Sequence, residues 1–128
     1  MANGSPYILR FRELYPTEHE MQEYSSLVEI TWAYEDSGSG MPSPETYERM
    51  NQFEDILEDK IESRKFCLLM TSITGGQKKI WQIYATDSDL FMDELNKVME
   101  GKEILPLQIE LFYDEEWNGY KELVELVQ

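Results

Sequence analysis

The sequence predicts a mixed α+β fold, in which two helices cover one face of an antiparallel sheet. Three observations support this prediction: two strand-like runs meet at a pair of glycines, two further runs alternate between apolar and polar residues, and two stretches with helical periodicity separate them. The chain has 128 residues, of which 41% are hydrophobic, so it can build one sizeable core. We therefore expect a single domain over residues 1–128, with residues 1–23 as an N-terminal extension and residues 27–122 as the α+β core.

The centre of the predicted sheet is a hairpin in residues 65–87. The run 66–73 is mostly apolar, and the run 80–85 is rich in the β-branched and aromatic residues that suit a pleated surface. Gly75 and Gly76 lie between them and accept the positive φ angles that tight hairpin turns need. The first run is apolar on both faces, so we expect an interior strand, and we expect the lysines that follow the turn to stay in solvent.

Two amphipathic helices flank this hairpin. Ser43 is a suitable N-cap and Pro44 suits the first turn, so a helix is expected over residues 43–62. Asp87 is a suitable N-cap for a second helix over residues 89–100. Each stretch repeats its apolar residues at helical spacing, so each helix has one side to bury.

The remaining strands complete the predicted topology. Residues 27–35 and 105–113 alternate apolar and polar side chains, and a C-terminal helix is expected after Asp114. The order is the β-α-β-β-α-β repeat of ferredoxin-like folds, an antiparallel sheet with two helices on one face, here with an added C-terminal helix. Right-handed crossovers would place the first and last of these strands side by side, at or near the centre. The alternative is an α+β meander in which residues 7–11 add a fifth strand.

The charge of the chain limits its partners. The net charge is −15 at pH 7, which argues against binding nucleic acid through phosphates and against binding an anionic membrane. A high net charge favours solubility in any protein, and it also suits a basic protein partner. The outer face of the first long helix concentrates this charge, and its acidic residues are Glu54, Asp55, Glu58, Asp59 and Glu62.

The sequence contains no clear catalytic set. Cys67 lies in the middle of an apolar strand, where a buried inert thiol is expected, and His19 is the only histidine. We expect no cofactor and no metal, and the protein is more simply explained as a non-enzyme. The chain shows no signal peptide and no apolar run long enough to span a membrane, so a cytoplasmic location is expected.

Aromatic residues offer a second candidate site. Most of them should fill the core. A ferredoxin-like sheet has one face without helices, however, and aromatic side chains there could form a platform for a ligand or a partner. The four candidates for this platform are Trp32, Tyr34, Trp117 and Tyr120.

Several short motifs occur in a characteristic order along the chain. They are Trp32-x-Tyr34, a glycine-rich loop and proline before a helix, Thr74-Gly75-Gly76, Trp81-x-x-Tyr84, and Pro106 followed by Asp114-x-x-Trp117-x-x-Tyr120. In this order the chain resembles, over about residues 27–122, the bacterial family catalogued as domain of unknown function 695. The resemblance implies no activity, cofactor or catalytic residue.

Two functions therefore remain open at this point. The first is a non-enzymatic interaction or regulatory module that binds a basic protein, acting as a monomer or homodimer. The second is a small-molecule-binding or hydrolytic domain, with a pocket between the open sheet face and the C-terminal helix.

Overall fold

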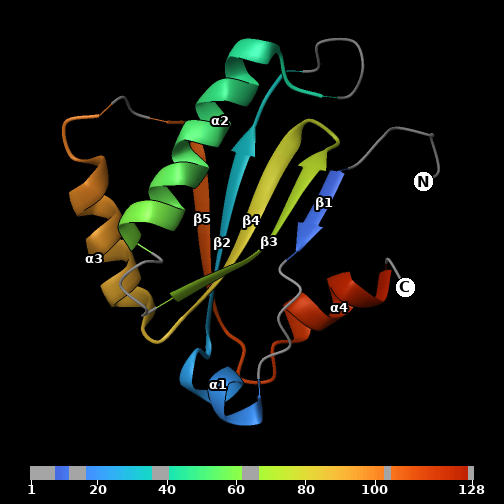
Figure 1. Ribbon diagram of the computed structural model, residues 1–128, viewed down its shortest axis with the longest axis vertical. Coiled ribbons are helices and arrows are strands. Elements are labelled where there is room, and N and C mark those ends of the chain that lie inside the picture. The colour runs from blue at the N-terminus through green and yellow to red at the C-terminus, as the bar shows by residue number, and fades with distance from the viewer. Residues whose placement is uncertain (1–7, 12–16, 36–40, 62–66, 103–104, 127–128) are drawn as a thin grey trace.

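The computed structural model describes residues 8–11, 17–35, 41–61, 67–102 and 105–126, and the fold is given for these ranges (Figure 1). The elements follow one another along the chain as β1 (Ile8–Phe11), α1 (Glu18–Glu23), β2 (Ser26–Ala33), α2 (Pro44–Ile56), the π-helical turn η1 (Leu57–Ile61), β3 (Cys67–Gly75), β4 (Lys78–Ala85), α3 (Ser88–Met99), β5 (Leu107–Tyr113) and α4 (Asn118–Leu126). The predicted mixed α+β fold with an antiparallel sheet is confirmed.

The sheet has five strands in the order β1-β3-β4-β2-β5, and every neighbouring pair is antiparallel. The predicted hairpin is β3 and β4, and β3 is an interior strand as expected. β2 pairs with β5, as the crossover argument required, but β5 lies at an edge of the sheet. The fifth strand of the alternative arrangement is also present, because β1 pairs with β3.

The hairpin turn is shifted by one residue from the two glycines. Gly75 ends β3 and pairs with Lys78, so the two-residue loop is Gly76-Gln77, with φ angles of 61° and 69°. Both loop residues therefore lie in the left-handed region, as a type I′ turn requires. Gln77 takes this conformation without the freedom of glycine, at a cost of roughly 1 kcal/mol.

The helix starts follow their predicted caps. The side chain of Ser43 accepts a hydrogen bond from the Thr46 backbone N–H, and Pro44 occupies the first turn of α2. Asp87 accepts hydrogen bonds from the backbone N–H groups of Asp89 and Leu90 at the start of α3. No helix in the described part of the chain is long and apolar enough to cross a membrane.

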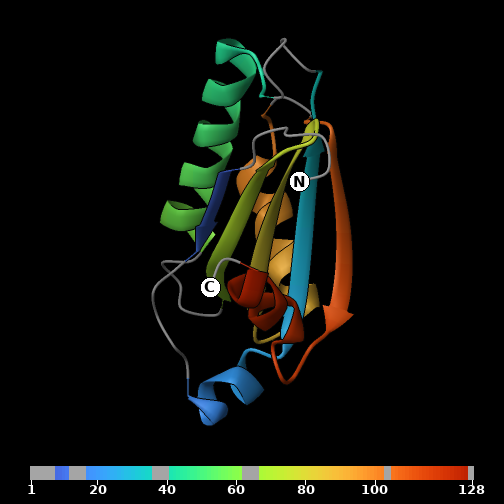
Figure 2. The same cartoon turned by 90° about the vertical axis from the view of Figure 1, so that its right-hand side faces the viewer.

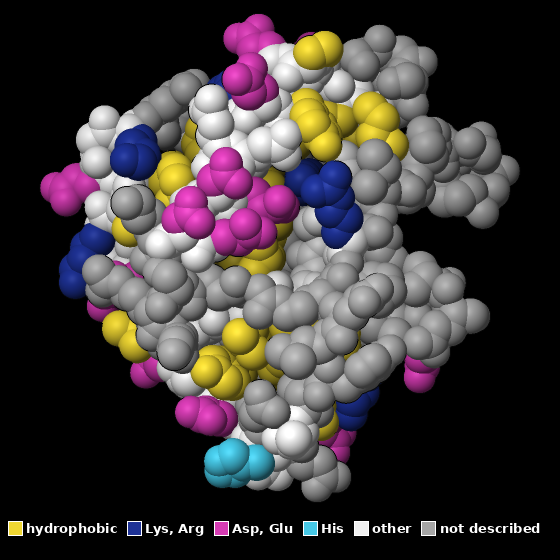
Figure 3. All heavy atoms as spheres, in the orientation of Figure 1, with side chains coloured by type: hydrophobic (Ala, Val, Ile, Leu, Met, Phe, Trp, Pro, Cys, Tyr) yellow, Lys and Arg dark blue, Asp and Glu magenta, His cyan; other side chains and the backbone are white. Residues whose placement is uncertain are grey.

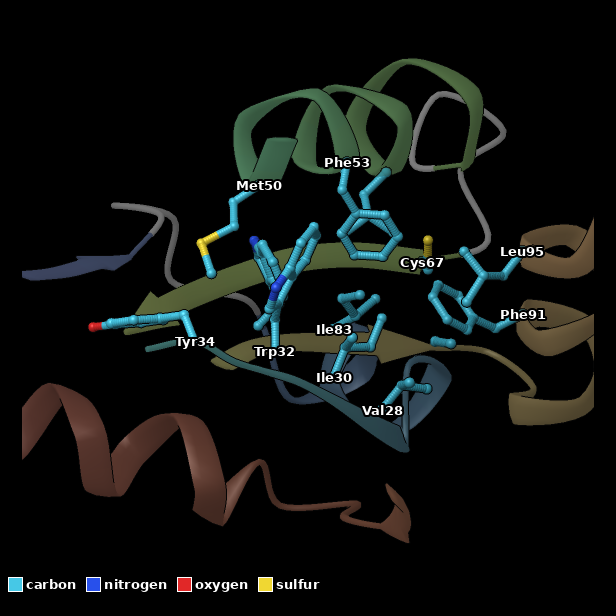
Figure 4. Packing of buried hydrophobic residues seen from close by; sticks show 13 residues of the cluster. Val28, Ile30, Trp32, Tyr34, Met50, Phe53, Cys67, Ile83, Phe91 and Leu95 are labelled. Carbon is cyan, nitrogen blue, oxygen red and sulfur yellow. The ribbon is translucent and has the colours of Figure 1, made fainter. Parts of the chain in front are cut away.

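The sheet separates two hydrophobic clusters. On the first face, α2 and α3 pack over the sheet and enclose the larger cluster, which Figure 4 shows from close by. Met50 and Phe53 reach it from α2, and Phe91 and Leu95 reach it from α3. On the second face, α4 crosses one end of the sheet (Figure 2). Tyr120 of α4 and Trp117, which directly precedes α4, form a smaller cluster with Leu27, Met70 and Tyr84.

Candidate functional site

The four aromatic residues of the predicted platform do not lie together. Trp32 and Tyr34 are buried in the larger cluster on the first face, whereas Trp117 and Tyr120 are buried in the smaller cluster on the second face. The reason is the alternation along β2, which directs Trp32 toward α2 while α4 covers the opposite face. All four are at most 8% exposed, so they fill the two cores and do not form one exposed platform.

Trp117 packs between α4 and the second face of the sheet. Its ring stacks on Tyr84 with centroids 4.0 Å apart and planes 15° apart, and its Nε1 donates a hydrogen bond to the Tyr24 carbonyl at 2.8 Å. The φ angle of Trp117 is 57°, a conformation that a bulky residue adopts only when its surroundings fix it. The side chains of Trp117 and Tyr120 thus belong to the smaller cluster between α4 and the sheet.

Asp114 connects the start of α4 to strand β4 of the sheet. Its carboxylate accepts hydrogen bonds from the backbone N–H groups of Asn118 at 2.8 Å and Gly119 at 3.0 Å, so it caps the start of α4. The same carboxylate accepts the hydroxyl hydrogen bond of Tyr84 at 2.8 Å. Burial, and then this bond to a carboxylate, raise the pKa of Tyr84 well above its ordinary value. The motif Asp114-x-x-Trp117-x-x-Tyr120 is therefore a structural connection between α4 and the sheet.

Gly119 is required by the same contact. A Cβ atom at this position would lie 3.1 Å from Leu27 Cδ2 and 3.3 Å from both Gln82 Nε2 and the Tyr84 hydroxyl oxygen. We expect Gly119→Ala to lower the free energy of unfolding by about 1–3 kcal/mol, because these buried neighbours must move. Urea denaturation would measure this loss. Gly101→Ala is a contrast with a different cause, because no atom lies within 4 Å of its added Cβ and its expected loss of about 1 kcal/mol comes from the positive φ of 78° alone. A Gly119→Ala protein as stable as the native one would show that α4 does not pack this closely.

The predicted acidic face of the first long helix divides into two parts. Asp55, Glu58 and Asp59 are exposed, and Figure 3 shows acidic side chains gathered over α2. We call these three residues the acidic surface. Glu54 instead turns toward the sheet, where its side chain is only 16% exposed. Glu62 lies outside the described residues.

Glu54 joins a buried polar contact that sequence reasoning missed. Its Oε1 accepts a hydrogen bond from Trp81 Nε1 at 2.8 Å and lies 3.6 Å from Lys79 Nζ. Lys79 was expected in solvent with Lys78, but it is only 3% exposed and its ammonium lies 5.2 Å from the centroid of the Trp81 ring. The strand alternation contained the signal, since Lys79 and Trp81 are two residues apart and share the face that α2 covers.

A small groove borders this contact. Arg10 from β1, Glu54 and Glu58 from the helical side, and Thr71 and Ser72 from β3 contribute to its lining, and its volume is about 230 Å³. Thr71 Oγ1 donates a hydrogen bond to Gln82 Oε1 at 2.7 Å, so that hydroxyl is already engaged. The groove combines a cationic and two anionic side chains, an arrangement that suits polar or charged groups of a partner.

The candidate reactive residues, Cys67 and His19, are not among the residues that line this groove. Cys67 is buried in the larger cluster, and His19 is exposed on α1. Within the described ranges, no three His, Cys, Asp or Glu side chains gather in a way that could hold a metal ion. The residues that the sequence offered for nucleophilic chemistry are thus not brought together.

Fold and surface together define a mixed α+β domain that presents exposed acids on one helix and buries most of the aromatic residues whose side chains the structure describes. The chain belongs to the family of unknown function DUF695, whose family model matches residues 1–124. The match is longer than the resemblance seen over residues 27–122, and it includes the segment that supplies β1 and α1. No curated protein matches the chain.

Proposed function

We propose that this protein is a non-enzymatic interaction module that binds a basic protein through the acidic surface of Asp55, Glu58 and Asp59. The net charge of −15 supports an electrostatic attraction to such a partner. Charges of this kind mainly raise the association rate and select the partner, and they add less to the final affinity.

The position of the acids on their helix is the observation that carries this proposal. Glu58 and Asp59 lie in η1, which directly continues α2 and forms its C-terminal end. Acidic side chains at a helix C-terminus meet the negative end of the helix dipole, which is unfavourable. Asp55 and Asp59 are also four residues apart, and a like-charge pair at that spacing costs roughly 0.2–0.5 kcal/mol. Both of these electrostatic effects are unfavourable to the helix, and a binding role would offset their cost.

The proposed class of fold is ferredoxin-like. The support for it is the order β2, α2, β3, β4, α3, β5, which is the β-α-β-β-α-β repeat, together with antiparallel pairing throughout. In this interpretation β1 is an addition to one edge, next to β3. We also propose a cytoplasmic setting, because the sequence has one cysteine, Cys67, and so offers no disulfide within the chain of the kind common in oxidising compartments.

Charge reversal of the acidic surface tests the proposed function. The variant carries Asp55→Lys, Glu58→Lys and Asp59→Lys, and it leaves Glu54 intact because that residue supports the core. The matched control makes the same change of charge at exposed acids on other elements, with Glu23→Lys, Glu122→Lys and Glu125→Lys.

The expected result is loss of partner proteins from a pull-down with the acidic-surface variant and their retention with the control. Raising the salt concentration should weaken capture by the native protein, because exposed charges are screened over about 8 Å at physiological ionic strength. Equal capture by all three proteins, or no capture by the native protein at low salt, would contradict the proposal.

A further inference from the structure

The two edges of the sheet differ in how they are protected. β1 has four residues and carries the exposed cation Arg10, and short charged strands are a common way to block edge pairing. β5 has seven residues and pairs with β2 without a register shift. Its C-terminal half is apolar and exposed, with Leu111, Phe112 and Tyr113 at 47%, 44% and 74%. Figure 2 shows β5 at the edge of the sheet opposite β1.

The backbone of β5 has a defined set of outward-facing groups. One residue beyond the strand, Asp114 N–H donates to the Ser25 carbonyl at 2.7 Å, so Asp114 and every second residue before it direct their backbone groups toward β2. The N–H and C=O groups of Ile109, Leu111 and Tyr113 therefore point away from β2. Among the described residues β5 pairs with β2 alone.

The open part of this edge has a clear limit. The Leu107 N–H donates to the Leu105 carbonyl at 2.8 Å, and Pro106 has no N–H, so the start of the strand is closed to pairing. With respect to the part of the chain that the structure describes, the open stretch runs from Ile109 to Tyr113. A row of unpaired backbone groups of this length is a template for an added strand.

The side chains around the open stretch indicate what would bind there. Ile109 and Leu111 alternate with Glu110, so apolar side chains lie on the α3 side of the sheet and an exposed carboxylate lies on the other side. Glu115 and Glu116 are exposed just beyond the strand. A strand laid against β5 would therefore gain from apolar residues opposite Ile109 and Leu111 and from a basic residue opposite Glu110.

We propose that the free edge of β5 binds an extended segment of a partner protein, in which apolar and basic residues alternate, as an additional strand. This inference depends on the β5 edge and not on the acidic surface. A second copy of the chain suits the edge less well, because each copy carries a net charge of −15 and a pairing centred on Leu111, the middle of the open stretch, would place Phe112 and not a cation opposite Glu110.

The test uses the full chain and synthetic peptides of valine and lysine. In one peptide the two residues alternate, and in another of the same composition the lysines form a block. Affinity is measured by fluorescence anisotropy at physiological salt, and hydrogen exchange is measured at the amides of β5. We expect the alternating peptide to bind at least about tenfold more tightly than the blocked one, and to slow exchange at Leu111 and Tyr113.

Variants locate the binding to the edge. Leu111→Lys and Glu110→Lys should each lower the affinity for the alternating peptide by about tenfold. Tyr47→Lys places the same new charge on an exposed residue of α2 and should leave its affinity nearly unchanged. Reversal of the acidic surface should also spare this peptide, so failure of one proposal is distinguishable from failure of the other.

Three outcomes would overturn the inference. One is equal affinity for the alternating and blocked peptides, and another is binding without protection of the β5 amides. The third is a homodimer in sedimentation experiments that Leu111→Lys dissociates, because the occupant of the edge would then be a second copy of the chain.

Discussion

Replacement of Glu54 by leucine is expected to lower the free energy of unfolding by about 3 kcal/mol, within the range found when one partner of a buried ion pair is removed. The change would leave the Lys79 ammonium without its carboxylate and the Trp81 N–H without its acceptor, both under α2. Urea denaturation followed by tryptophan fluorescence would measure the shift in the unfolding midpoint.

The double variant Glu54→Leu/Lys79→Met is the control for this prediction. It removes both charges from the same buried site, so it should recover much of the loss, since an apolar replacement of a whole buried pair is often neutral. If the two single losses simply add in the double variant, the contact between Glu54 and Lys79 does not contribute as a pair.

Replacement of Asp114 by alanine is also expected to lower the free energy of unfolding by about 3 kcal/mol. About 1 kcal/mol is expected from the lost cap of α4, and about 2 kcal/mol from the buried Tyr84 hydroxyl that loses its charged acceptor. The substitution removes the hydrogen bonds that Asp114 accepts from the Asn118 N–H, the Gly119 N–H and the Tyr84 hydroxyl. Thermal and urea unfolding of the variant would measure the loss.

Asp114→Asn is the matched control, because it keeps an oxygen that can cap the helix but removes the charge. It should cost clearly less than the alanine variant. Tyr84→Phe combined with Asp114→Ala should be less harmful than the sum of the two, since both changes remove the same bond. Equal losses for alanine and asparagine would contradict the role of Asp114 as a cap.

Local chemistry made much of the fold predictable. The cap at Ser43, the cap at Asp87 and the glycine pair of the hairpin each act through groups that are close in sequence, so their outcome depends little on the rest of the chain. The one-residue shift of the hairpin turn arose because Gln77 tolerates a left-handed conformation that glycine was expected to supply.

The candidate site was harder to predict, because it depends on contacts between distant elements. Glu54 looked like one of several solvent acids, and Lys79 looked like a hairpin-tip lysine, until the pairing of β2, β3 and β4 placed both under α2. The C-terminal helix was expected after Asp114, but it begins at Asn118, and Trp117 precedes it in a left-handed conformation that its stacking on Tyr84 supports. The periodicity of the sequence does not reveal that a contact with a distant residue stabilises an unfavourable backbone conformation.

The central place of β2 has a consequence for how the chain reaches its native state. Ile30 pairs with Trp81 on one side and with Ile109 on the other. β2 is therefore synthesised well before either of the two strands with which it pairs. Pairings so distant in sequence are associated with slow folding, on the scale of roughly milliseconds to seconds. A nascent chain that ends before β5 leaves the β5 side of β2 without its partner strand, and unpaired strand edges of this kind are prone to aggregation during folding.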